Sequence, residues 1–313
     1  MSTPTTTAEA GVEAGPLVCR RCGDAAGPFT IDGLCEDCAL ADVLPGVYGI
    51  QAEEYHADPI PGGSLSSTGA RRLLECPARF RYLLDHPEPY KPAYEYGTAA
   101  HTVVLGDGPE LVVVDAARWD TNETKTLVRE LRAAGKVPLK KATKQKIDDM
   151  AAVLAADPEA ADLFAPGSGE AEQSLFWPDP RFGVWRRARP DWLRPDRIVD
   201  YKTVRSARPE DLRRAFWEHG YGQQQEWYRD GAAELGILPR DAPFTFVCQE
   251  KEPPYVVTVV ELDFFFAEAG RHLTERALAR YVECRETGHW PGYVTGTTYL
   301  SMPPWAEREL QEN

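Results

Sequence analysis

The sequence predicts an α/β domain that follows a small cysteine-rich module. Segments with the composition of β-strands alternate with segments that have the apolar periodicity of helices, which is the order expected of a sheet flanked by helices. Hydrophobic residues make up 43% of the 313-residue chain, enough for a sizeable core. Since no internal repeat is present, we expect one main domain with a short appendage.

Charge is acidic overall and unevenly distributed. The formal net charge of −14 argues against binding nucleic acid through bulk charge. Residues 124–146, however, hold eight Lys and Arg against one Glu, and residues 181–214 hold eleven against five acids. Such segregation would suit a groove for a polyanion, and ordinary solvated helix faces would explain it equally well.

Targeting signals are not evident in the sequence. No apolar run approaches the ~18 residues of a membrane helix, and residues 1–16 lack the basic head and apolar core of a secretion signal. We therefore expect a cytoplasmic protein without a membrane partner.

Four of the seven cysteines form two C-x2-C pairs, Cys19 with Cys22 and Cys35 with Cys38, separated by twelve residues. Each pair can direct two thiolates at one ion, and four thiolates close a tetrahedral zinc site that leaves no place for a catalytic water. We predict a structural zinc ribbon over residues 16–40, whose folding requires the metal because so short a segment cannot build a core. Four free thiols in a tail are the alternative.

Composition divides the rest of the chain. Residues 1–15 have little to bury and predict a disordered tail. Residues 41–63 are rich in Pro and Gly and predict a linker. The main domain is expected over 64–300, followed by a tail over 301–313.

Each element of the main domain has a sequence signal. Residues 64–86 predict two helices divided at Pro77, residues 95–105 a helix with His101 at its middle, and residues 124–156 a single helix. Strands bounded by prolines, and then further helices and strands, complete the domain. We expect strands at 172–177, 184–189, 198–202, 245–248 and 255–262, and helices at 209–235 and 263–287.

Three residues of the predicted strand region form a possible catalytic group. Alternate residues of a strand share a face about 6.6 Å apart, so Asp200 and Lys202 project together, and Asp191 can meet Asp200 across a hairpin. Paired carboxylates suit Mg²⁺ or Mn²⁺, and a lysine beside them can stabilise charge on a phosphate. Taken alone, D-x-K is more often a surface salt bridge.

The surrounding motifs resemble a known family. PD followed nine residues later by D-x-K is similar to the PD-(D/E)xK nuclease superfamily, and GTAAH at 97–101 resembles the histidine motif of its RecB and RecE types. Gln224 and Tyr228 resemble the Q-x-x-x-Y helix of the same group. The text CPARF at 76–80, GEAEQSLFW at 169–177 and RARPDWL at 187–193 resembles the RecE, or exonuclease VIII, branch.

The resemblance, which covers residues 64–235, implies a restriction-endonuclease-like core with a central mixed sheet and a metal-dependent DNA exonuclease. In that family linear duplex is degraded from the 5′ end, which leaves 3′ tails for recombination by strand annealing. The implied partners are linear DNA, further copies of the chain in a ring and a single-strand annealing protein, in a bacterial or phage-infected cell.

The same resemblance implies roles for individual residues. His101, Asp191 and Asp200 would bind Mg²⁺ or Mn²⁺, and Lys202 would be the catalytic lysine. Without the motif, His101 would be read as a core histidine.

Residues around this group have less specific roles by resemblance. Gln224 and Tyr228 would support the site or touch the DNA backbone. Arg187 and Arg189 match basic residues that could contact phosphate, with salt bridges as the alternative. Glu172 matches an acidic family position and could equally be a surface glutamate at the end of a strand.

Two rival hypotheses remain open. The first is a Cas4-like nuclease that acts on single-stranded ends. Such nucleases hold an iron–sulfur cluster, which we do not expect here because Cys76 precedes the histidine motif while only Cys248 and Cys284, widely spaced, follow it. The second is a zinc-ribbon DNA-binding adaptor with an inactive nuclease fold.

Overall fold

The structure is a computed structural model, and it describes residues 19, 21–22, 24–25, 34–40, 43–86, 92–116 and 118–311. The predicted tail at 1–15 and parts of the predicted zinc ribbon at 16–40 lie outside this range. None of the helices in the described ranges is long and apolar enough to cross a membrane.

A five-stranded mixed sheet forms the centre of the main domain, in the order β11-β10-β9-β8-β5. The longest strands, β9 (Ile198–Val204) and β10 (Phe244–Glu250), run parallel, and the other neighbours are antiparallel. The remaining strands are β5 (Glu170–Ala171), β8 (Trp192–Leu193) and β11 (Val257–Glu261).

Two smaller sheets accompany it. One has the order β1-β6-β7-β2, and the other is the parallel pair β3 and β4. Their bounds are β1 (Gly46–Tyr48), β2 (Leu65–Ser66), β3 (Leu111–Val113), β4 (Val137–Leu139), β6 (Ser174–Pro178) and β7 (Trp185–Ala188).

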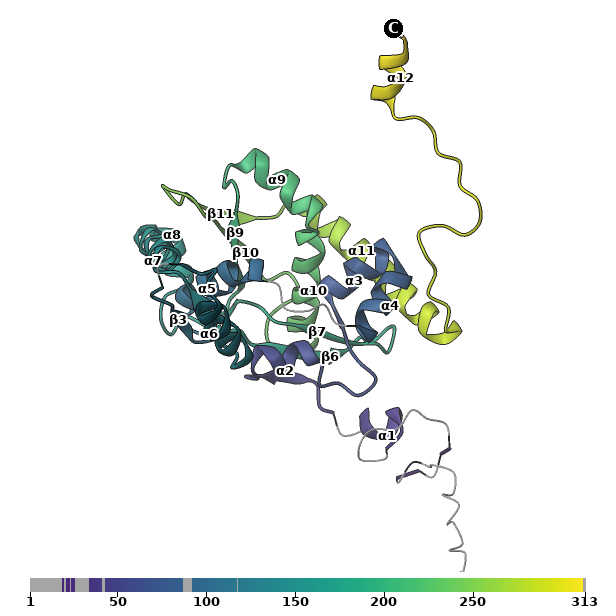
Figure 1. Cartoon of the computed structure of the whole chain (residues 1–313). Helices are drawn as coiled ribbons and strands as arrows, with labels where there is room; N and C mark the ends of the chain where they lie inside the picture. Colours follow the sequence, from purple (N-terminus) through teal and green to yellow (C-terminus); the bar gives the residue numbers. More distant parts are fainter. Residues whose placement is uncertain are drawn as a thin grey trace, which may run out of the picture.

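Helices cover both faces of the central sheet, because successive residues of β9 point to opposite sides. Ile198 belongs to a core shared with α3 (Ser67–Glu75), α10 (Tyr221–Glu234) and α11 (Phe264–Thr287). Val199 and Tyr201 belong to a second core with α5 (Glu95–Leu105), α7 (Lys141–Ala156) and α8 (Pro158–Leu163). Figure 1 shows these two helical layers on either side of β9 and β10. The predicted α/β architecture is confirmed.

Several predicted elements are found as expected, and two helices are not. The helix at 95–105 is α5, and Pro77 divides α3 from α4 (Pro77–Asp85). The single helix predicted over 124–156 is wrong. Gly135 takes a positive φ of 71°, and the chain forms α6 (Asn122–Ala133), then β4, then α7. Gly220, with φ 66°, likewise divides the helix predicted at 209–235 into α9 (Pro209–Glu218) and α10.

The predicted linker at 41–63 packs on the domain where the structure describes it. β1 pairs with β6, and it is followed by α2 (Ala52–Ala57). Tyr55 of α2 and Ile60 are buried in a cluster with Phe176 of β6. Leu40, the last residue of α1 (Glu36–Leu40), touches the same cluster, so the cysteine region adjoins the domain.

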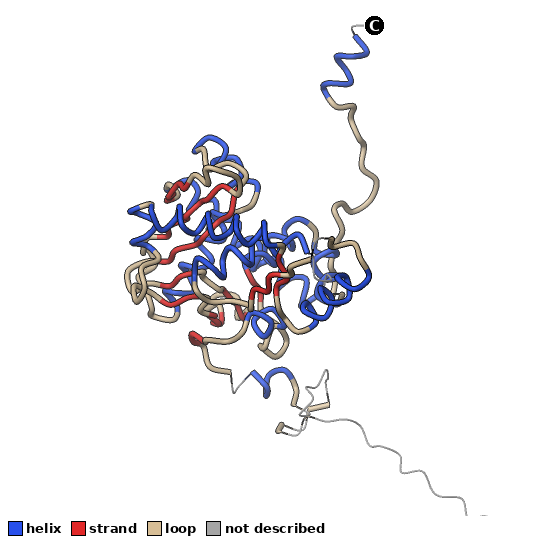
Figure 2. The backbone as a smooth tube through the Cα atoms, turned by 60° about the vertical axis from the view of Figure 1, so that its left-hand side comes forward, coloured by secondary structure: helices blue, strands red, loops and turns tan. Residues whose placement is uncertain are grey.

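At the other end, the chain leaves the body of the domain. Residues 291–303 form no helix or strand, and α12 (Pro304–Gln311) lies away from the sheets in both backbone views (Figures 1 and 2). Tyr299 and Leu300 are almost fully exposed there.

A buried arginine joins β7 to α10. The Arg186 guanidinium lies 4.0 Å from the centroid of the Trp227 ring and 4.9 Å from that of Trp177. It forms ion pairs with Asp179 at 3.0 Å and Asp230 at 3.2 Å. A charge this deeply buried is tolerated because acids and aromatic faces surround it, and it fixes α10 behind the central sheet.

Candidate active site

Three carboxylates lie in a row across neighbouring strands. Ala171 pairs with Trp192, and Trp192 pairs with Val199. Continuing this antiparallel register by one residue places Glu172, Asp191 and Asp200 side by side. The Glu172 N–H donates a hydrogen bond of 3.0 Å to the Asp191 carbonyl, which extends the ladder to this row.

The backbone turns sharply at Glu172. Its φ of 50° lies in the left-handed region, which non-glycine residues seldom occupy. Strand β5 ends at the preceding residue, and the Glu172 side chain is brought toward His101 and Asp191. A strained residue held in place beside acidic and imidazole groups is typical of functional sites.

His101, Glu172 and Asp191 form a candidate metal centre. One ligand atom from each lies within 4.8 Å of the others, and His101 Nδ1 is 3.6 Å from Asp191 Oδ2. His101 comes from helix α5, and the centroid of its ring lies 5.1 Å from that of the Tyr201 ring on β9. The two carboxylates repel each other at this distance. One nitrogen and two carboxylates therefore fit a divalent cation such as Mg²⁺ or Mn²⁺.

Asp200 and Lys202 lie next to this centre on β9. Asp200 is almost fully buried and forms an ion pair with Lys202 through Oδ1, while Gln224 Nε2 donates 2.7 Å to Oδ2. The Lys202 ammonium also lies 5.0 Å from the centroid of the Tyr221 ring. Tyr228 follows Gln224 by one turn of α10 and is buried. Helix α10 therefore orients Asp200.

Burial and mutual repulsion perturb the titration of these groups. Burial, reinforced by the charge of Asp200, raises the pKa of Asp191 to about 8. The pKa of Glu172 is raised by burial and by Asp191, and the pKa of His101 is lowered by burial and by Lys202. Burial alone would lower the pKa of Lys202, but Asp200 and Asp191 raise it, so the ammonium stays charged. Carboxyl groups with raised pKa values beside a neutral imidazole are typical of a metal site without its cation, because the cation would offset the repulsion between the carboxylates.

The two predicted DNA-contacting arginines are engaged within the protein. Arg187 forms an ion pair with Asp58 and donates 2.8 Å to the Ser64 carbonyl. Arg189 donates 2.6 Å to Glu172 and 2.9 Å to the Ile50 carbonyl. Their contact with phosphate stays a prediction, whereas the salt bridges considered as its alternative are present.

The structure gathers the predicted residues in one place but groups them differently from the prediction. His101, Asp191, Asp200, Lys202, Gln224 and Tyr228 all lie around the end of β8 and the middle of β9. The tight cluster of ligand atoms contains Glu172 in place of Asp200, which pairs with Lys202 instead. The spacing of residues could not reveal this grouping, because it depends on the left-handed backbone at Glu172. The roles assigned to these residues stay predictions.

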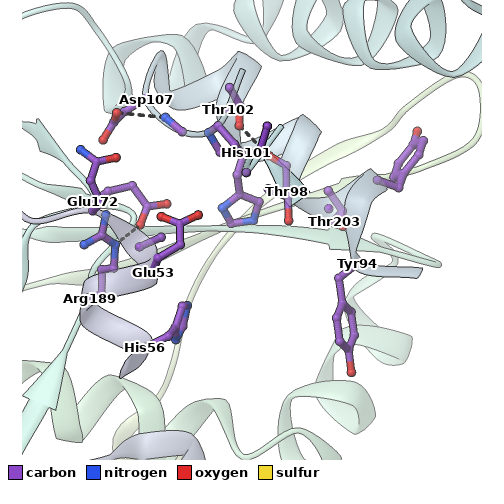
Figure 3. Close-up of a pocket in the computed structure, with 18 of the residues that line it drawn as sticks. Glu53, His56, Tyr94, Thr98, His101, Thr102, Asp107, Glu172, Arg189 and Thr203 are labelled. Carbon is purple, nitrogen blue, oxygen red and sulfur yellow. Dashed lines mark hydrogen bonds and ion pairs between the residues drawn. The ribbon is translucent and has the colours of Figure 1, made fainter. Parts of the chain in front are cut away.

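Two cavities flank the site. One has a volume of about 780 Å³ and contains His101 at its wall, and the other has a volume of about 480 Å³ and reaches Tyr228. Both are bordered by His56, Glu172 and Arg189. Figure 3 shows the larger cavity, with His101, Glu172 and the α2 side chains Glu53 and His56 around it.

Many of the basic residues in the two stretches form ion pairs within the protein. Nine of the eleven basic residues in 181–214 form ion pairs, as do four of the eight in 124–146. Most of the basic charge in 181–214 and half of that in 124–146 is therefore paired with acids. This observation favours the plainer explanation of the charge pattern.

Away from this site, the four N-terminal cysteines converge. The sulfur atoms of Cys19, Cys22, Cys35 and Cys38 all lie within 4.8 Å of one another, and the Cys22 and Cys35 sulfurs are 3.6 Å apart. Four sulfurs bound tetrahedrally at ~2.3 Å from zinc would be ~3.8 Å apart. The Cys35 N–H also donates 3.3 Å to the Cys19 sulfur, a contact that stabilises a thiolate. Cys76, Cys248 and Cys284 are separate buried thiols.

The comparisons with known proteins concern the main domain. None of the curated proteins compared with this sequence matches it significantly. A solved structure from Eubacterium rectale, described as a "putative exonuclease", is similar in fold, with a TM-score of 0.57 and 14% sequence identity over 81% of this chain and 97% of the other. The model of the PDDEXK-like domain of unknown function DUF3799 matches residues 66–302, about three quarters of the chain. The chain therefore belongs to this PDDEXK-like family.

Proposed function

We propose that the chain is a divalent-metal-dependent DNA exonuclease that degrades linear duplex DNA from the 5′ end and leaves 3′ single-stranded tails. The observation that carries the proposal is the convergence of His101, Glu172 and Asp191 beside the Asp200–Lys202 pair. Membership of a PDDEXK-like family and the fold shared with a "putative exonuclease" support it.

The residues of the site divide the chemistry among them. His101, Glu172 and Asp191 would hold Mg²⁺ or Mn²⁺, with Asp200 on the neighbouring strand, and the cation would supply Lewis acidity and a more acidic water. The Lys202 ammonium can donate hydrogen bonds to a phosphate oxygen as negative charge develops on it. Gln224 keeps the Asp200 carboxylate in position, and Tyr228, one turn further along α10, is buried in the core.

Two further parts of the proposal concern a structural metal ion and protein partners. The four cysteines would bind a structural Zn²⁺, with one zinc per chain expected by elemental analysis and none after Cys35→Ser and Cys38→Ser together. Further copies of the chain in a ring, and a single-strand annealing protein that takes up the 3′ tail, are proposed from the motif resemblance alone.

Digestion of linear duplex DNA labelled separately at its 5′ and 3′ ends tests the proposal. With Mg²⁺, the 5′ label should be lost first, and EDTA or Lys202→Ala should abolish the loss. Lys125→Ala, at an exposed position of α6, is the matched control and should digest normally. Loss from single strands only would replace this proposal with a Cas4-like activity, and DNA binding without any cleavage would replace it with an adaptor.

A further inference from the structure

Helix α2 lies outside the matched family domain, which begins at residue 66, yet it borders both cavities at the candidate site. We propose that α2 is a wall of the DNA-binding cleft and that His56 contacts a backbone phosphate of the strand in the active site. This inference rests on the proposed nuclease function and assigns a further substrate-binding residue to it.

The first argument is the place of His56. It lines the cavity that contains His101 and also the cavity that contains Tyr228. Glu172, a member of the candidate metal centre, also lines both cavities. In Figure 3 the imidazole projects from α2 into this space, on the same side of the helix as Glu53. A strand that occupied both cavities would therefore lie beside His56.

The second argument is the chemistry of the cavity walls. The smaller cavity offers hydroxyl groups, which suit phosphates, from Ser66, Ser67 and Thr68. The larger one contains Tyr94, 59% exposed, on whose ring an unpaired base can stack. His56 stands where these two kinds of wall meet, so its N–H group is available to the backbone between them.

The third argument is that the imidazole has no other use in the fold. His56 is exposed, and within the described part of the chain it makes no hydrogen bond; its ring meets only the edge of the Tyr55 ring, at 5.3 Å. Tyr55, the adjacent residue, is the one that anchors the helix by burial. Deleting the His56 side chain therefore removes a donor from the cleft and little from the core.

The fourth argument is that α2 is held rigidly. At its C-terminal end, Asp58 accepts 2.6 Å from the Ser64 N–H and forms an ion pair with Arg187. Just before its N-terminal end, the Ile50 carbonyl accepts 2.9 Å from Arg189. Groups fixed in this way contact a substrate without first losing conformational entropy.

Steady-state digestion of 5′-labelled duplex by His56→Ala tests the inference. We expect KM to rise about 10- to 150-fold, the loss of one hydrogen bond to a charged group, while kcat stays within about twofold. The dissociation constant for fluorescein-labelled duplex, measured with Mg²⁺ in a Lys202→Ala background, should rise by the same factor. His56→Gln, which keeps an N–H donor, should recover part of both losses.

His272→Ala is the matched control, because His272 is an exposed histidine on α11. Its KM and dissociation constant should match those of the unaltered chain, and all variants should keep the same melting temperature and Mn²⁺ affinity. If the unaltered chain cleaves DNA while His56→Ala keeps its KM and dissociation constant, the inference is overturned and the nuclease assignment stands. If the unaltered chain cleaves no DNA, both are overturned.

Discussion

Asp191→Asn should stabilise the metal-free protein although it removes a candidate ligand. In the folded chain the pKa of Asp191 is raised by burial and by Asp200 to about 8, against an ordinary value of 3.8. Because the folded chain holds this proton more tightly than the unfolded chain, the contribution of Asp191 to stability is fully present below pH 3.8 and is lost as pH rises through about 8. At pH 7, about 3 pH units above 3.8, the free energy of unfolding has fallen by at most about 4 kcal/mol, at about 1.4 kcal/mol per pH unit.

Asparagine does not ionise, so its presence at position 191 does not lower the free energy of unfolding as pH rises. Its side-chain oxygen can still accept the hydrogen bond that the Tyr201 N–H donates to Asp191 over 2.7 Å. Urea unfolding in EDTA at pH 5, 6, 7 and 8 tests this expectation. The free energy of unfolding of Asp191→Asn should exceed that of the unaltered chain by an amount that grows as pH rises. With Mg²⁺ the order should reverse, because only the unaltered chain gains stability from binding the cation.

Asp196→Asn provides a control of opposite sign. Burial would raise the pKa of Asp196, but its hydrogen bonds with Arg197 and Arg194 outweigh this effect and lower it. Its charge is thus favourable at pH 7, and the variant should be slightly less stable than the unaltered chain. If Asp191→Asn shows no gain in EDTA at pH 7 and 8, the repulsion inferred for the carboxylate row is refuted.

Three further variants probe separate contacts. Lys202→Met should lower kcat about 100-fold or more while Mn²⁺ binding by calorimetry persists, because it removes the ammonium but no ligand; unchanged kcat would exclude a role in the reaction. Gln224→Ala should lower kcat about tenfold, since Asp200 loses the donor at Oδ2, and full activity would show that Asp200 needs no such support. Arg186→Met should lower the free energy of unfolding by about 3–5 kcal/mol in urea, because Asp179 stays buried without its cation and Asp230 keeps only its ion pair with Arg240; a loss below 1 kcal/mol would contradict this role.

The sequence indicated that Asp191, Asp200 and Lys202 lie close together because that relation depends on short-range spacing. Asp200 and Lys202 share a face of one strand, and Asp191 lies one residue before the strand that pairs with it. The helix of His101 follows from local periodicity, whereas the interest in Gln224 and Tyr228 came from the motif resemblance. Relations between residues that are close in sequence can be predicted without knowledge of the tertiary structure.

What could not be predicted depends on contacts between distant segments. Glu172 enters the metal cluster only because the backbone there turns into the left-handed region, which no residue type at 172 announces. The breaks at Gly135 and Gly220 were signalled by glycine and were outweighed by the surrounding helical pattern. Arg187 and Arg189 found partners more than 120 residues away, which composition cannot indicate.

The pairing of β1 with β6 has a consequence for where the folding unit begins. The family match starts at residue 66, but a fragment cut there would lose an edge strand and the helix that covers Phe176. It would leave that aromatic ring open to water and the guanidinium of Arg187 without Asp58. A sequence boundary drawn from the shared domain thus falls inside the cooperative unit, whose physical beginning is near residue 43.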